Sequence, residues 1–161
     1  MIQPKTSYIT LQEAINYFTG MLNTSSWDNA SISDQTKSLI QASGDIDKIA
    51  YIGQKLNPQS EHEFPRQFED PLIDDTPYDV DGLPFGIKYA VCEQALALLD
   101  GFDVNKELDG LTVTASRYST VEVQYNRDTV PMHLKCGLCA KAWQYILPFI
   151  RDNRSLLLSR V

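Results

Sequence analysis

Cysteine and histidine residues near the C-terminal end form the group in this sequence that most resembles a reactive site. Cys136 and Cys139 are separated by two residues, and His133 precedes them by three. On one helix the outer two of these side chains diverge by about 120°. No second CxxC or histidine pair completes a tetrahedral zinc site, and a redox CxxC normally begins a helix after a strand. We interpret the cysteines as small buried hydrophobic residues, the less favoured alternative being a metal or redox site, and expect no cofactor.

A second candidate site is the segment Asp79-Val-Asp81-Gly82, which has the alternating acids and the glycine of a calcium loop. Aligning Gly82 with the invariant glycine of that loop puts Pro77 at the first ligand position and Lys88 at the twelfth. Neither residue can be a ligand there. A solvated acidic loop that leads into a helix N-terminus explains the carboxylates better.

The acidic residues are concentrated in one segment of the chain. The net charge is −7, and eight acidic residues face Arg66 alone between residues 61 and 81. Four prolines between residues 57 and 81 disfavour a long helix or a regular strand, so we expect a long acidic loop. No GxSxG, HExxH, GxGxxG or P-loop motif occurs, and we do not expect an enzyme.

The longest apolar segment, residues 82–101, predicts a central buried helix. Pro84 lies near its start and Gly101 just after its end, as helix termini prefer. Ile87, Val91 and Ala95 follow one stripe. We expect Lys88, Glu93, Gln94 and Asp100 to mark its few contacts with water.

Other periodic segments predict the elements around this helix. Thr10 and Glu13 form a capping box that begins a helix ending at Gly20, with Leu11, Ile15 and Phe18 on one side. Apolar spacing predicts further helices over 34–56 and 131–150, and alternation predicts a hairpin of strands 111–116 and 120–125. We therefore predict a mainly α protein: a small bundle of about four helices around a central helix, with one β-hairpin and a long acidic loop.

The length of 161 residues predicts one domain, residues 1–161. No apolar run is long enough for a membrane span, and the N-terminus lacks the apolar region of a signal peptide. Three cysteines without an export signal predict reduced thiols. We expect a soluble protein that is made in a cytoplasm.

An ordered set of motifs resembles one known family. The set runs Ser7-Tyr8-x-Thr10-x-x-Glu13-Ala14-x-x-Tyr17-Phe18, Trp27, a helix ending near Tyr51, Phe64-Pro65-Arg66, Leu83-Pro84-x-x-Ile87-Lys88-x-Ala90-x-Cys92-Glu93-x-Ala95, and a hairpin ending at Tyr125. It is similar to tailed-phage proteins that carry the name DnaT-like single-stranded-DNA-binding proteins. The likeness covers residues 6–150 and departs at Phe64, where the family commonly has Trp; residues 151–161 form an unmatched tail.

Proteins of this type resemble head-tail adaptors, also called connector or head completion proteins. The resemblance implies a ring of twelve copies in the neck of the virion, between the portal protein and a tail or neck protein, through which double-stranded DNA passes without specific binding. It implies no membrane partner and synthesis in the host cytoplasm. The alternative is a single-stranded-DNA-binding replication accessory protein, which the acidic net charge disfavours.

Two groups of residues are candidate contact sites in such a ring. Acidic side chains of the loop, Asp70, Asp74, Asp75 and Asp79, would repel passing phosphates if they face the channel, and would aid solubility if they lie on the outer rim. The tail combines a leucine triplet with flanking arginines, a composition typical of a contact with the portal or another partner: Arg151, Arg154, Leu156, Leu157, Leu158 and Arg160.

Overall fold

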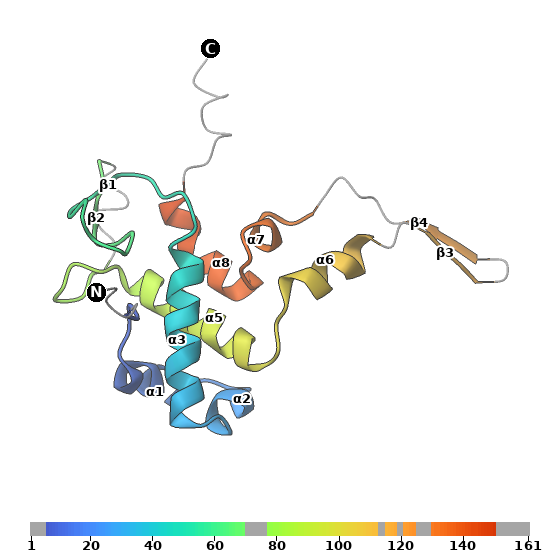
Figure 1. Ribbon diagram of the computed structural model, residues 1–161, viewed down its shortest axis with the longest axis horizontal. Coiled ribbons are helices and arrows are strands. Elements are labelled where there is room, and N and C mark those ends of the chain that lie inside the picture. The colour runs from blue at the N-terminus through green and yellow to red at the C-terminus, as the bar shows by residue number, and fades with distance from the viewer. Residues whose placement is uncertain (1–5, 70–76, 113–114, 119–120, 125–129, 151–161) are drawn as a thin grey trace, which may run out of the picture.

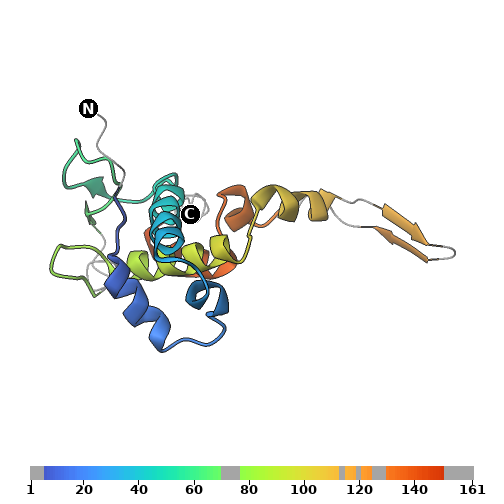
Figure 2. The same ribbon diagram turned by 60° about the horizontal axis from the view of Figure 1, so that its bottom comes forward.

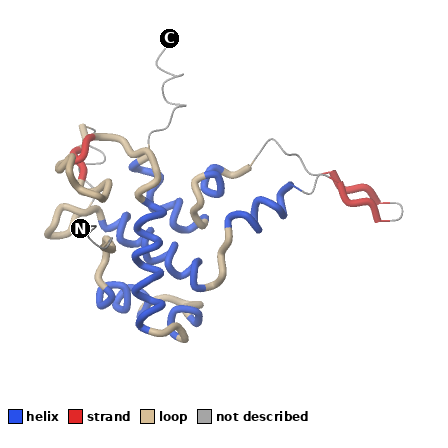
Figure 3. The backbone as a smooth tube through the Cα atoms, viewed as in Figure 1, coloured by secondary structure: helices blue, strands red, loops and turns tan. Residues whose placement is uncertain are grey.

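The computed structural model describes residues 6–69, 77–112, 115–118, 121–124 and 130–150 (Figure 1). Helices dominate these residues, and the strands form two short antiparallel pairs (Figure 3). The predicted mainly α fold class is confirmed. The described elements are α1 (Leu11–Thr19), α2 (Ser25–Asp28), α3 (Ile32–Ile46), β1 (Gln54–Lys55), β2 (Arg66–Gln67), α5 (Phe85–Leu99), α6 (Val104–Thr112), β3 (Ala115–Tyr118), β4 (Val121–Gln124), α7 (Met132–Lys135), α8 (Ala140–Ile146) and a 3-10 turn, η1 (Leu147–Phe149).

Helix α1 begins at the predicted capping box. The Thr10 hydroxyl accepts from the Glu13 backbone N–H, and the Glu13 carboxylate accepts from the Thr10 N–H at 2.8 Å. The helix ends before Gly20, as predicted. Its buried residues are Ala14 and Phe18, whereas Ile15 is 38% exposed. The prediction that Ile15 lies on the buried side was wrong, because α1 contacts the core through Ala14 and Phe18.

Helix α5 is the central helix that the sequence predicts. Pro84 is its N-cap, and Gly101 adopts the left-handed backbone (φ +88°) that ends it. The helix packs between α3 and α8 (Figure 1), and Ile87, Ala90 and Val91 are fully buried. Of the four polar residues predicted to contact water, Asp100 is exposed, whereas Lys88, Glu93 and Gln94 are buried, because each has polar partners from other segments.

Helix α3 begins after its N-cap Ser31 and ends at Ile46, ten residues before the predicted end at Leu56. Beyond it, Ile52 donates its N–H to the Phe149 carbonyl, and Gly53 has φ +73°. These contacts turn the chain into β1, which pairs with β2 inside the segment that was predicted to be loop. Tertiary contacts with η1 therefore override the helical spacing of this segment.

The segment 131–150 is not the single helix that was predicted. It divides into α7, α8 and η1, and Gly137 has φ +78° at the division. A new helix begins after Cys139, whose sulfur accepts from the Ala142 N–H. Helices α2 and α6 were not predicted, and α2 carries the buried Trp27 that packs on Phe18.

The predicted hairpin is present, with Ala115 opposite Gln124 and Tyr118 opposite Val121. Its first strand begins later than predicted, since α6 extends to Thr112. In Figures 1 and 2 the two strands lie beyond the end of α6, far from the helical body. The described structure is thus a helical body from which an arm, the β3–β4 hairpin, extends.

Candidate interaction surfaces

Helix α5 positions a buried cation between two carboxylates. Lys88 Nζ lies 2.7 Å from Glu13 Oε1 and 2.7 Å from Asp79 Oδ2. The side chains of Lys88 and Asp79 are 9% and 8% exposed, whereas that of Glu13 is 44% exposed. The other Asp79 oxygen accepts the N–H groups of Asp81 and Leu83, each at 2.9 Å. The cluster fixes the end of the acidic loop to α1 and α5.

The pKa values of this cluster reflect the ion pairs. Burial acts to raise the pKa of the Asp79 carboxyl, but the hydrogen bonds from Lys88 and the backbone hold it below its ordinary value. Burial acts to lower the pKa of Lys88, and its two carboxylate partners raise it overall. The hydrogen bond from Lys88 is the main cause of the lowered pKa of Glu13. All three groups are therefore charged at neutral pH.

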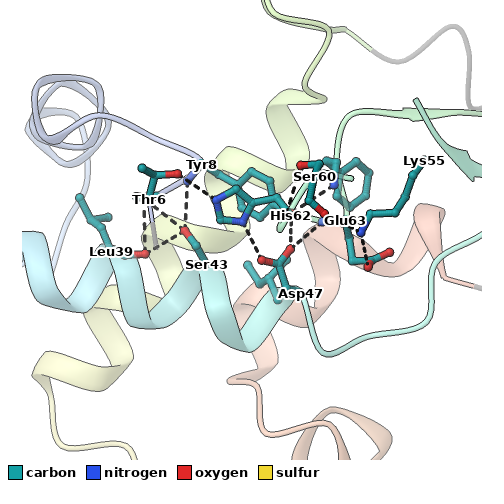
Figure 4. Close-up of polar contacts among 12 residues, drawn as sticks. Thr6, Tyr8, Leu39, Ser43, Asp47, Lys55, Ser60, His62 and Glu63 are labelled. Carbon is teal, nitrogen blue, oxygen red and sulfur yellow. Dashed lines mark hydrogen bonds and ion pairs between the residues drawn. The ribbon is translucent and has the colours of Figure 1, made fainter. Parts of the chain in front are cut away.

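A second polar network ties the acidic loop to the end of α3 (Figure 4). Asp47 accepts hydrogen bonds from the Tyr8 hydroxyl and the Glu63 N–H, and its other oxygen lies 2.7 Å from His62 Nδ1. Thr6 contacts the second ring nitrogen of His62 at 3.1 Å. Burial, followed by the Asp47 carboxylate, raises the pKa of Tyr8 far above its ordinary value. One carboxylate thus joins the N-terminal segment, α3 and the loop.

Arg66 fastens the same loop to the chain after α3. Its guanidinium donates to the carbonyls of Ile52 and Gly53 at 2.9 and 2.7 Å, and pairs with the Glu63 carboxylate at 2.6 Å. Lys55 pairs with the other oxygen of Glu63 at 3.1 Å. Within the described part of the loop, Glu63 and Asp79 are therefore neutralised inside the chain, while Glu61, Glu69 and Asp81 are exposed.

The structure separates the members of the CxxC motif. Cys136 follows α7 and Cys139 caps α8, where burial raises the pKa of both thiols. Cys92 is fully buried in α5, and burial raises its pKa to about 12. In the described residues, no group of three or more His, Cys, Asp or Glu side chains is arranged to hold a metal ion.

A cleft of about 610 Å³ opens between α3, α6, α7 and the end of α5. Its apolar lining consists of half-buried or buried side chains: Leu98, Phe102, Val104, Leu108, Leu134 and Cys136. The charged side chains of the lining are Asp45, Asp103, Lys48 and Lys135, and the remaining lining residues are Gln41, Gln94, Asn105 and Gly137. A smaller cleft of about 380 Å³ lies beside Tyr8, His62 and Lys88.

The family model described as "Putative DnaT-like ssDNA binding protein" matches residues 4–147. The chain belongs to this family. No curated protein and no solved structure gives a significant match. Membership agrees with the family resemblance of the sequence motifs, and the matched residues include the whole helical body up to Leu147.

Of the predicted contact residues, Asp79 is the one that lies within the described part of the chain. Its carboxylate is turned to Lys88 in the single chain, and its role beside DNA stays a prediction. The remaining predicted residues lie outside the described ones: Asp70, Asp74, Asp75, Arg151, Arg154, Leu156, Leu157, Leu158 and Arg160. Sequence reasoning missed the roles of Lys88 and Asp47, because nothing local to either residue indicates its distant partners. No described helix is both long and apolar enough to span a bilayer.

Proposed function

We propose that this family member is a structural head-tail adaptor of a tailed bacteriophage. In this proposal copies of the chain form an oligomeric ring in the neck of the virion, which joins the portal protein to a tail or neck protein and lets double-stranded DNA pass. The protein has no catalytic role and needs no cofactor. The observation that carries the proposal is the β3–β4 hairpin, which extends from the helical body on an arm (Figure 2).

A hairpin in this position supports assembly for a physical reason. Two strands alone are marginally stable in water, and each leaves one row of backbone N–H and C=O groups without a ladder partner. Strands β3 and β4 form a two-stranded sheet, and the helical body does not cover them in either view (Figures 1 and 2). A neighbouring subunit that adds a strand would satisfy these groups. Repetition of one such head-to-tail contact builds a ring.

The alternative is binding of single-stranded DNA, which the family description favours. Binding of this kind uses exposed aromatic rings beside a basic groove. Phe18 and Trp27 are instead 3% and 2% exposed and pack on each other. The chain also carries a net charge of −7. These features favour the adaptor, which needs surfaces for other proteins rather than for bases.

Co-assembly with the portal protein tests the proposal. We expect electron micrographs of the mixture to show a ring of this protein on the portal. In a variant whose residues 115–124 are replaced by a Gly-Ser linker of equal length, the helical body should melt at the wild-type temperature while the ring is lost. A matched control is Leu22→Ser, because Leu22 is 88% exposed and lies outside the arm.

Two results would contradict the adaptor. One is ring assembly by the linker variant at wild-type concentrations, which would show that the hairpin does not form the contact between subunits. The other is tight, salt-dependent binding of a single-stranded oligonucleotide without any binding to portal, measured by fluorescence anisotropy. That second result would support the replication accessory function.

A further inference from the structure

The cleft between α3, α6 and α7 has one apolar wall, and no described segment fills it. Leu98 reaches it from the end of α5, Phe102 from the connection to α6, and Val104 and Leu108 from α6, and each is only half-buried. Leu134 reaches it from α7. The recess of about 610 Å³ thus has an apolar wall opposite polar lining residues of α3, and the apolar wall favours an occupant with apolar side chains on one side.

The described chain ends close to the rim of this cleft. Ile150 forms an antiparallel bridge with Tyr51, and Ile52 donates to the Phe149 carbonyl at 2.9 Å. Tyr51 follows Lys48, which lines the cleft, by three residues, a separation of at most about 11 Å. Ile150, the last described residue, therefore lies near Lys48 at the edge of the cleft.

The length and composition of this tail match the cleft. Eleven residues follow Ile150, and Leu156, Leu157 and Leu158 begin six residues into them. Six extended residues span about 20 Å, which is enough to carry the leucines from the exit point over the rim. The tail is the longest segment outside the described residues and the one that contains three consecutive leucines.

We infer that the C-terminal tail of this chain docks in its own cleft, with the leucine triplet on the apolar surface formed by α5, α6 and α7. The charges of the cleft lining, two carboxylates and two lysines, do not select the occupant, so leucine burial supplies the affinity. Attachment to the same chain raises the effective concentration of the tail to the millimolar range. Docking buries the leucines that the sequence predicts as partner contacts and leaves only the arginines available to a partner. The inference concerns the single chain and holds whether or not the chain forms a ring.

A disulfide to the native Cys136 tests the docking, because this thiol lines the cleft. The variant combines Leu157→Cys with Cys139→Ser, which keeps an N-cap acceptor for α8. Under mild oxidation by diamide we expect a disulfide within one chain between Cys136 and the thiol introduced at position 157, seen by peptide mapping of the monomer band. The matched control adds Cys136→Ser and should not form it. A disulfide that joins two chains, or none to Cys136, would overturn docking in the same chain.

A labelled peptide of residues 151–161 provides the second test. In the full chain with Leu156, Leu157 and Leu158 replaced by Ser, the cleft is open, and the peptide should bind at least tenfold more tightly than to the wild type, whose own tail competes. Adding Leu108→Ser should abolish the gain, while Leu22→Ser should not. Equal binding to the wild type and the triple variant would overturn the inference.

Discussion

Replacing Lys88 by methionine would test the buried ion cluster of α5. Methionine keeps most of the alkyl packing of lysine but leaves the Asp79 carboxylate, 8% exposed, without its cation. Removing one partner of a fully buried pair costs about 3–5 kcal/mol. Because Glu13 is 44% exposed and stays hydrated, we take the lower end, about 3 kcal/mol, for this cluster. In a chain of this size that loss lowers the thermal midpoint by about 6–12 °C.

The loss should depend on pH with a defined sign. The folded-state pKa values of Glu13 and Asp79 are lowered, so these carboxylates stabilise the fold above their unfolded values, near pH 4, and lose that contribution as pH falls through the folded values. The folded-state pKa of Lys88 is raised, so its contribution is complete below about pH 10 and is lost above it. The difference between wild type and Lys88→Met should therefore be largest between about pH 5 and 10 and should shrink toward pH 3.

Urea denaturation and thermal melting at pH 7 and pH 3.5 measure both effects. The control is Lys37→Met, because Lys37 is 73% exposed and its partner Asp34 lies 3.5 Å away at the surface. The control should leave the midpoint almost unchanged. An equal destabilisation by Lys88→Met at both pH values, or one no larger than that of the control, would refute the reasoning.

Two further substitutions test the turn after α3 and the polar network at its end. Gly53→Ala should destabilise the protein by more than about 1 kcal/mol, because φ is +73° and a Cβ would lie 2.2 Å from the Gln67 carbonyl oxygen. The control is Gly20→Ala, whose Cβ would have no atom within 4 Å and which should leave the urea midpoint almost unchanged. Tyr8→Phe should cost about 1–3 kcal/mol, since it removes the donor to Asp47 and the acceptor of the Phe64 N–H. A Tyr8→Phe protein with the wild-type urea midpoint would show that water replaces the hydroxyl at no cost.

The sequence determined the elements whose signals are local. The capping box at Thr10 and Glu13 and the Pro84 and Gly101 ends of α5 were predicted, because each depends on residues close to the helix terminus. The mainly helical class and the hairpin were predicted from the spacing of apolar residues, and the structure shows both. The ordered motifs were also sufficient to indicate the family.

Tertiary structure decided where those local signals end and which polar residues are buried. The helical spacing of α3 continues past Ile46, but the pairing of Tyr51 with Ile150 ends the helix there. Lys88 looks like a solvent contact in the sequence and is buried, because Glu13 and Asp79 are its partners 75 and 9 residues away. A charged side chain is buried at a tolerable cost only where an oppositely charged partner lies beside it. The order of residues along the sequence does not show which distant residues become such partners. The same is true of the cleft, whose apolar surface exists only where α3, α5, α6 and α7 come together.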